Sequence, residues 1–307
     1  MPRAKGLTAQ AAFLCLSILM PCTASTGAER CPALQLLHGL PVDGPGGLHP
    51  SGLTWRQGIL FAVSDKHDTT IFRVELHENR AVFTPAVRFD VPGPRPIDGL
   101  DFEGITCDET GRFYLVSETH CRVLRVTADG AEAAWITPDL GPSGRKSGLF
   151  AVWNAGLEGI ARVGPHRLVL CAERQPRGLL TVDIGRTPPK IETFRCDRTR
   201  LDFRSRAPDF AGLWHDDTGL YAIARNAYVI CKLLRTDTGF EEGTGWSYEA
   251  VETEPEWRYG DMRYGKAEGL AMDKDRIYLI LDNNGAARQS NPTDHRPLLF
   301  IFKRPAQ

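Results

Sequence analysis

One hydrophobic–polar pattern occurs five times along the chain. Each copy has a glycine followed by Leu or Ile, then a polar turn, then a β-rich run that ends in an acidic or amide residue. The copies span residues 50–66, 101–119, 156–174, 209–227 and 266–284, and their shared glycines are Gly52, Gly104, Gly159, Gly212 and Gly269. Successive glycines are 52, 55, 53 and 57 residues apart. A period near 50 residues with several short strands per unit predicts propeller blades rather than a helical solenoid, whose units are about 33 to 47 residues long.

Alternation and β-branched content predict the strands within a copy. In the second copy we expect strands at 104–107, 113–117, 123–127 and 131–137. The fifth copy offers only 269–272, 277–281 and 298–303. A strand at 33–37 belongs to no copy, and beside 298–303 it would close the ring and cover an open sheet edge. We therefore expect an all-β fold, a single propeller of five four-stranded blades closed by the N-terminal strand.

Three segments are expected to be loops between blades. Residues 91–96 and 141–148 are rich in Pro and Gly, and 238–266 is a long insertion. If 238–266 supplied extra strands, the alternative would be six blades.

The first residues have the pattern of a secretory signal peptide. Arg3 and Lys5 precede an apolar run at 11–20, and small residues follow at 22–28. We expect cleavage after Ala24 or Ala28, leaving residues 29–307 as the propeller domain of a periplasmic or extracellular protein. The ten-residue run is shorter than the roughly 20 residues that a membrane span needs, so a membrane anchor is the weaker alternative.

Composition narrows the class of protein further. The 307 residues are 42% hydrophobic and 24% charged, which is typical of a globular chain. With 37 basic and 38 acidic residues and no long basic run, the chain is not expected to bind nucleic acid. Six cysteines follow the signal, and both disulfides and separate buried thiols remain open. The sequence does not determine the oligomeric state.

The repeat brings carboxylates together. A tight hairpin places the residue before each shared glycine near the residue that ends the next strand. This reasoning pairs Glu103 with Glu118, Glu158 with Glu173, and Glu268 with Asp282, which Asn283 follows. The other two copies offer Ser51 with Asp65 and Ala211 with Asn226. Because the first strand of each blade lines the central channel, we expect these groups to meet at one mouth of that channel.

Such a cluster needs compensation. Two like charges about 4 Å apart cost roughly 4 kcal/mol at an effective dielectric constant of 20. Protonation, the neighbouring cations Lys66, Arg174, Arg225 and Lys266, or a divalent ion could each supply it. Oxygen ligands without clustered His or Cys favour calcium. Alternatively, the glutamates only fix blade geometry, although Ser51 and Ala211 in two copies argue against a purely architectural role.

Several of these segments resemble the phytase-like domain of exported bacterial proteins with esterase-like activity. They are 102–105, 157–161 with 171–173, and 267–271 with 281–284, and the resemblance extends over about 33–303. The chain is more distantly similar to calcium-dependent propeller lactonases and propeller phytases, which hold calcium at the channel mouth. The resemblance implies that Glu103, Glu158 and Glu268 face a metal. It also implies a second ring of Glu118, Glu173, Asp282 and Asn283, while Ser51 and Ala211 leave the number of ions open.

Two functions follow as hypotheses. The first is a calcium-assisted hydrolase of a small anionic ester or phosphoester, with Glu118 or Glu173 as general base and Arg174 and Arg225 binding the anionic group. No GxSxG elbow is present, which argues against a serine-triad esterase. The alternative is a non-catalytic periplasmic propeller that binds a ligand or protein and holds a structural metal. Four tryptophans could serve such a surface or pack in the core: Trp153, Trp214, Trp246 and Trp257.

Overall fold

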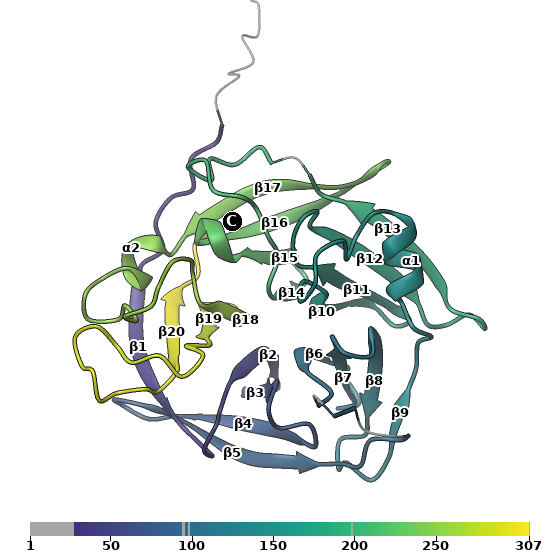
Figure 1. The fold of residues 1–307 in the computed structure, drawn as a ribbon, viewed down its shortest axis with the longest axis horizontal. Helices are drawn as coiled ribbons and strands as arrows, with labels where there is room; N and C mark the ends of the chain where they lie inside the picture. The colour runs from purple at the N-terminus through teal and green to yellow at the C-terminus, as the bar shows by residue number, and fades with distance from the viewer. Residues whose placement is uncertain (1–27, 94–95, 98, 198, 307) are drawn as a thin grey trace, which may run out of the picture.

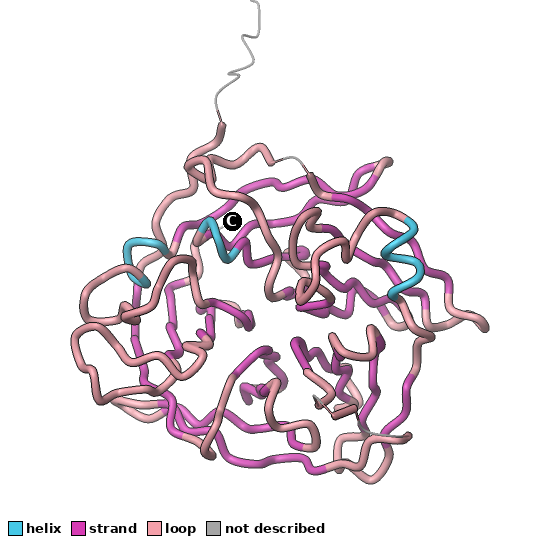
Figure 2. Tube along the Cα trace, in the orientation of Figure 1, coloured by secondary structure: helices cyan, strands magenta, loops and turns pink. Residues whose placement is uncertain are grey.

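The computed structural model describes residues 28–93, 96–97, 99–197 and 199–306. The fold is all-β: the described residues form twenty strands, two short α-helices and a 3-10 turn. The sheets are arranged around a central axis, as expected for a propeller (Figure 1). Figure 2 shows how little of the trace is helical. The predicted signal peptide falls, apart from its last residue, outside the described residues.

Three sheets have four antiparallel strands in chain order. The first contains β6 (Phe102–Cys107), β7 (Phe113–Ser117), β8 (Arg122–Val126) and β9 (Ala133–Trp135). The second contains β10 (Leu157–Gly164), β11 (Arg167–Ala172), β12 (Gly178–Asp183) and β13 (Lys190–Arg195). The third contains β14 (Leu213–Asp216), β15 (Gly219–Ala224), β16 (Val229–Thr236) and β17 (Gly239–Ser247). The strands expected in the second copy of the repeat are therefore present.

The remaining eight strands form one sheet, in the order β18-β19-β20-β1-β5-β4-β3-β2. It contains β1 (Leu36–Asp43), β2 (Pro50–Arg56), β3 (Ile59–Ser64), β4 (Thr70–Leu76), β5 (Ala81–Arg88), β18 (Ala267–Met272), β19 (Arg276–Leu281) and β20 (Leu298–Lys303). Strand β1 pairs antiparallel with β20 from Leu36 to Pro41. It meets β5 in parallel only at Val42 and Asp43.

The boundaries predicted for the N-terminal strand were wrong. Strand β1 lies at Leu36–Asp43 rather than 33–37, although it does pair with β20. The preceding backbone is held elsewhere: Ala33 bridges Ser247 in parallel, and the Leu34 N–H donates to the Ser247 carbonyl at 2.8 Å.

Two of the expected loops contain regular structure. Residues 238–266 include β17, the outer strand of its sheet, and the helix α2 (Glu249–Glu252). Residues 141–148 include the helix α1 (Gly141–Lys146). Strand β17 was missed because it is an edge strand with the sequence GFEEGTGWS, which lacks a continuous β-branched or alternating apolar signal.

The core lies between the sheets rather than in a single central mass. In the described part of the chain, four of five buried apolar clusters join two neighbouring sheets. One of them packs Phe61 and Ile71 against Phe102 and Leu115. The fifth lies within the eight-stranded sheet, between the strands β2–β5 and the strands β18–β20 with β1. The axis is therefore free to hold polar groups, because the apolar burial that stabilises the fold occurs away from it.

The shared glycines allow the innermost strands to approach one another. A methyl group at Gly159 would lie 2.7 Å from the backbone nitrogen of Leu213, and one at Gly104 would lie 2.8 Å from the carbonyl oxygen of Glu158. The same crowding continues in order around the axis, from Gly52 to Gly104, from Gly212 to Glu268 and from Gly269 back to Leu53. Each glycine thus faces the inner strand of the next copy, and the fifth faces the first.

A β-bulge precedes four of these glycines. The strand pairing skips one residue between Pro50 and Gly52, between Phe102 and Gly104, and between Ala267 and Gly269, and it also shifts between Leu157 and Ile160. The extra residues are Ser51, Glu103, Glu268 and, in the shift before Ile160, Glu158. A bulge re-aims the side chain of its extra residue, and it does so here at the same end of four of the five inner strands.

Candidate active site

A cavity of about 290 Å³ lies where the inner strands begin, and we call it the acidic cavity. Eight carboxyl groups line it: Asp65, Asp101, Glu103, Glu118, Glu158, Glu173, Glu268 and Asp282. The cationic groups in its lining are Lys66, Arg174 and Arg225. In the described structure, carboxyl groups therefore outnumber cations by a wide margin in a confined space.

Backbone hydrogen bonds hold the carboxylates at this end. The Glu118 N–H donates to the Asp101 carbonyl at 2.9 Å, and the Glu173 N–H donates to the Gly156 carbonyl at 3.0 Å. Asp282 makes the same bond to Lys266 at 2.9 Å. In each case the donor ends the second strand of a blade and the acceptor lies three residues before the shared glycine. This is the hairpin geometry from which the convergence was predicted.

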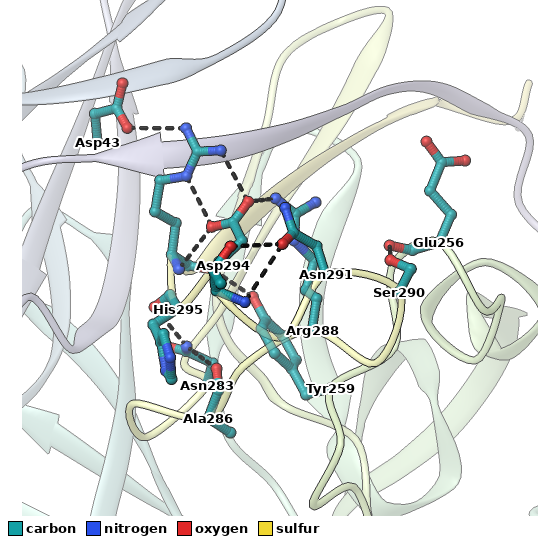
Figure 3. Close-up of polar contacts among 12 residues, drawn as sticks. Asp43, Glu256, Tyr259, Asn283, Ala286, Arg288, Ser290, Asn291, Asp294 and His295 are labelled. Atoms are coloured by element: carbon teal, nitrogen blue, oxygen red, sulfur yellow. Dashed lines mark hydrogen bonds and ion pairs between the residues drawn. The ribbon is translucent and has the colours of Figure 1, made fainter.

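Asn283 is the exception among the predicted site residues. Its side-chain amide donates to the carbonyls of Ala286 at 2.6 Å and His295 at 2.7 Å, and the residue is 1% exposed (Figure 3). The amide therefore braces the loop after β19 and does not line the acidic cavity. We remove Asn283 from the candidate metal ligands, and its neighbour Asn284 lines the cavity instead.

The same loop is fastened to the sheet by an ion-pair network (Figure 3). Buried Asp294 is paired with both Arg288 and Arg296. Arg296 also reaches Asp43 of β1 at 3.1 Å. The loop that carries Asn284 to the cavity is thus anchored to β1.

Arginine neutralises one half of the cavity. Arg225 lies on the 3-10 turn η1 (Arg225–Ala227) after β15 and forms ion pairs with Glu173 and Glu268. Its Nε lies 3.4 Å from an oxygen of buried Asp209. Arg174 also pairs with Glu173. We call this side the arginine half.

The opposite side has far less compensation, and we call it the acidic half. Oxygens of Asp65, Asp101 and Glu103 all lie within 4.8 Å of one another. Lys66 contacts one oxygen of Asp65 at 2.6 Å, but Oδ1 of Asp65 is buried and makes no hydrogen bond. Glu158 is 8% exposed, and no hydrogen bond or ion pair of its carboxylate is found among the described residues.

Burial dominates the protonation of these groups. Burial raises the pKa of Glu118 to about 7, although the Gly156 N–H donates to its carboxylate at 2.7 Å. Burial also raises the pKa of Glu268 to about 7, against the opposing effect of Arg225. The pKa values of Glu103 and Glu158 lie well above the usual range through burial, and the charges of neighbouring carboxylates raise them further. At neutral pH the cluster therefore either retains protons or needs an additional cation.

Sequence reasoning missed Asp101 and Asp209. Both occupy the same position in a D-F-x-G segment, at 101–104 and 209–212, and this shared position was the available signal. Buried Glu252 on α2 was also missed. It accepts a hydrogen bond from the Lys266 N–H and belongs to no repeat, so no pattern could have indicated it.

A larger cavity of about 920 Å³ adjoins the arginine half. It shares Glu173, Arg174, Arg225, Glu268 and Asn284 with the acidic cavity. Its other lining groups include Arg206, Arg263, Lys266 and the exposed Tyr264. We call it the basic groove, because it presents cations beside an acidic site.

Other predicted features resolve as follows. The six cysteines of the described residues are free thiols. Trp246 is buried and Trp214 and Trp257 pack against the core, whereas Trp153 is 91% exposed next to Asn154, which lines the acidic cavity. In the described part of the chain, no helix has the length and apolar character needed to cross a membrane.

A comparison with models of protein families shows which family the chain belongs to. The model of the phytase-like family, described as esterase-like activity of phytase, matches residues 44–285. The chain belongs to the phytase-like family. The match covers all five copies of the repeat, and it confirms the resemblance found in the sequence. No curated protein matches the phytase-like chain.

Solved structures similar to the phytase-like chain include the glutaminyl cyclase of Myxococcus xanthus, with 13% identity, a TM-score of 0.53 and coverage of 91% of this chain and 100% of that one. The aldose sugar dehydrogenase of Streptomyces coelicolor in its PQQ-bound form has 12% identity, a TM-score of 0.48 and coverage of 89% and 98%. The virginiamycin B lyase of Staphylococcus aureus has 12% identity, a TM-score of 0.43 and coverage of 82% and 66%. At these identities the likeness concerns the fold alone, which is that of a β-propeller.

Proposed function

We propose that this phytase-like protein is a calcium-assisted hydrolase of a small anionic ester or phosphoester, acting in the acidic cavity. The observation that carries the proposal is the excess of carboxyl groups over cations in that cavity, concentrated in the acidic half. A cluster of this kind needs positive charge in the ionised state. Membership of a family described by esterase-like activity supports a hydrolytic role.

The acidic half fits calcium. Calcium prefers six to eight oxygen ligands, and carboxylates in flexible arrangements suit it. Asp65, Asp101 and Glu103 would hold the ion, and the buried, unpartnered Oδ1 of Asp65 supplies an oxygen without a competing hydrogen bond. Glu158 lines the same cavity, and among the described residues its carboxylate makes no direct ion pair, although the charge of Arg225 acts on it. When bound, the ion would polarise the oxygen of the scissile group and favour ionisation of a nearby water.

The other predicted metal ligands are less suited to this position. Glu268 is already paired with Arg225, and Asp282 accepts from His49 Nδ1 at 3.3 Å. Both would have to give up a partner to bind an ion in the acidic half. We therefore propose a calcium site that shares Glu103 with the sequence-based set and adds Asp65 and Asp101.

Glu118 is the proposed general base. Its raised pKa, about 7, lies near physiological pH, where a base is most effective. The Gly156 N–H orients one carboxylate oxygen, and Asp101 of the proposed metal site is within hydrogen-bonding reach of Glu118. Glu173 is less suited to proton transfer, because two arginines are paired with it.

The arginine half would bind the anionic group of the substrate. Arg174 and Arg225 face the cavity, and a guanidinium can form two parallel hydrogen bonds to a phosphate or carboxylate. The basic groove continues this positive surface outward through Arg263 and Lys266. A substrate held there would present its ester bond toward Glu118 and the acidic half.

The remaining architectural and cellular predictions stay part of the proposal. We count the eight-stranded sheet as two blades, β2–β5 and β18–β20 with β1, because β1 meets β5 at only two residue pairs. This count makes five blades closed by β1. We also retain residues 1–28 as a cleaved export signal, which N-terminal sequencing of protein recovered from a periplasmic or culture fraction would check.

The test combines metal analysis with turnover. Purified protein is analysed for bound elements and then assayed, with and without chelator, on a phosphomonoester, phytate, a lactone and an aryl ester. We expect calcium-dependent turnover of at least one substrate. Glu118→Gln should lower kcat by roughly 10²- to 10⁴-fold in protein that remains folded at the assay temperature. The matched control is Glu109→Gln, an exposed glutamate on the same blade that pairs with Arg162.

The non-catalytic propeller is the competing function. It predicts no turnover on the panel and a metal that affects only stability. Inert protein that contains stoichiometric calcium would support that function and refute the hydrolase.

A further inference from the structure

A third cavity, of about 490 Å³, lies between the sheets β10–β13 and β14–β17, which are neighbours around the axis (Figure 1). It opens at the end of the molecule opposite the acidic cavity. Val163, which lines it, is five residues along β10 from Glu158, or about 16 Å at roughly 3.3 Å per residue. We call this cavity the inter-blade cavity.

Its floor is apolar. Val163, Val169, Leu220, Leu233 and Phe240 line it, and they belong to the hydrophobic cluster between the two sheets or pack against it. This composition differs from that of the acidic cavity, whose lining is carboxylate and arginine. Cavities of about 300 to 1,000 Å³ with apolar walls and a few placed polar groups are the usual form of small-molecule sites.

The rim carries two arginines, Arg167 and Arg235, that lack a directly paired carboxylate among the described residues. A hydrogen bond from a neighbouring lysine and, to a smaller degree, the charge of Arg235 nevertheless lower the pKa of nearby Glu192. The Arg235 guanidinium lies over the rings of Phe194 and Phe240, 4.3 and 4.9 Å from their centroids. This stacking holds its charge at the edge of the apolar floor while its N–H donors remain available.

The other polar groups leave that positive charge in excess. Glu192 is engaged by Lys190 at 3.0 Å and by the Thr181 hydroxyl at 3.4 Å. Half-buried His215 also lines the cavity, and burial lowers its pKa, which favours the neutral ring. An apolar chamber with a cationic rim matches a ligand that has an apolar body and one anionic head.

We propose that the inter-blade cavity binds a carboxylate with an apolar acyl body, whose chain packs on Val163, Leu233 and Phe240 and whose head pairs with Arg235 and Arg167. This site is separate from the proposed hydrolytic site and does not depend on it. The two sites have different chemistry and lie at opposite ends of the inner strands.

Calorimetry with octanoate tests the proposal, with octan-1-ol as the uncharged comparison. We expect one saturable octanoate site and binding of octan-1-ol at least tenfold weaker. Arg235→Met should weaken octanoate binding at least tenfold, and Val163→Phe, which fills the chamber, should abolish it. Arg186→Met is the control, because this exposed arginine pairs with Asp183 outside the cavity. It follows β12, in the blade that carries Val163 and Arg167.

Melting curves show whether each variant is folded. Because Arg235 is exposed, Arg235→Met tests the proposal even if Val163→Phe does not fold. Absence of saturable binding at millimolar octanoate, or unchanged binding to Arg235→Met, would overturn the proposal. So would loss of binding in Glu158→Gln, which would place octanoate in the acidic cavity. A concentration-dependent dimer abolished by Phe240→Ala would assign the surface to a second copy of the chain and would also refute the proposal.

Discussion

At the scale of single residues, Arg225 governs the charge balance of the arginine half. It contacts three carboxylates, those of Glu173, Asp209 and Glu268, which come from different blades. No local sequence signal connects these groups. Arg225 can contact all three carboxylates only because the inner ends of three blades meet at the axis.

Replacement of Arg225 by Met should destabilise the protein in a pH-dependent way. Removing one partner of buried ion pairs leaves unpaired charge, so we expect the free energy of unfolding to fall by about 3 kcal/mol at pH 8. The loss should shrink at pH 5.5, because Glu268 can then be protonated. Urea unfolding at both pH values measures the effect. Arg263→Met, in the same groove but with no ion pair among the described residues, should change stability by less than about 0.5 kcal/mol. An equal loss in both variants would contradict this account.

At the scale of elements, one short segment has two functions. The glycine of each inner strand permits close approach to the next blade, and in four of the five copies the strand is bulged at the residue before it. This explains why the glycine is kept in all five copies while the preceding residue varies among Glu, Ser and Ala. The glycine builds the ring, and the preceding position determines what chemistry the ring displays.

Gly159→Ala should therefore cost stability without altering the charge of the site. The added methyl group would meet the backbone nitrogen of Leu213 at 2.7 Å and the Ala211 carbonyl at 2.8 Å, and overpacking of this kind costs about 1 to 3 kcal/mol. Thermal or urea unfolding checks it. At Gly46 a methyl group would meet nothing within 4 Å, so Gly46→Ala is the control and should leave stability nearly unchanged. Equal stability of the two variants would show that the inner strands can move apart.

At the scale of the whole molecule, the fold places its apolar burial between the sheets and its acidic groups along the axis. A ring of blades can tolerate buried carboxyl groups there because the five clusters found in the described residues carry the hydrophobic stabilisation. Because carboxyl groups outnumber cations at the axis, protonation or cation binding there should change the stability of the folded protein.

We predict that metal-free protein loses stability as the pH rises from about 4.5 to 8. The pKa values of Glu118 and Glu268 are raised to about 7 in the folded state, whereas unfolded glutamate titrates near 4.3. The folded state therefore binds more protons over this range, and stability falls with pH until both groups are ionised.

Calcium should reduce the fall, because it stabilises the ionised cluster. Melting temperatures with chelator and with calcium measure both effects, and Glu118→Gln should flatten the metal-free curve. Stability that rises with pH in chelator would refute the prediction.

The sequence alone determined the repeat, its β-strands and the pairs of carboxylates at the hairpin ends, because these depend on local periodicity and on the short reach of a tight turn. It also indicated Arg174 and Arg225, which adjoin repeat positions. Only the tertiary structure decided which carboxylates are paired with arginine and which face other carboxylates. Asp65, Asp101 and Glu103 come from two blades, and Asn283 is turned into its loop by bonds to Ala286 and His295. These contacts depend on how closely segments that are distant in the chain approach one another. The spacing of residues along the sequence does not show which of those side chains come into contact.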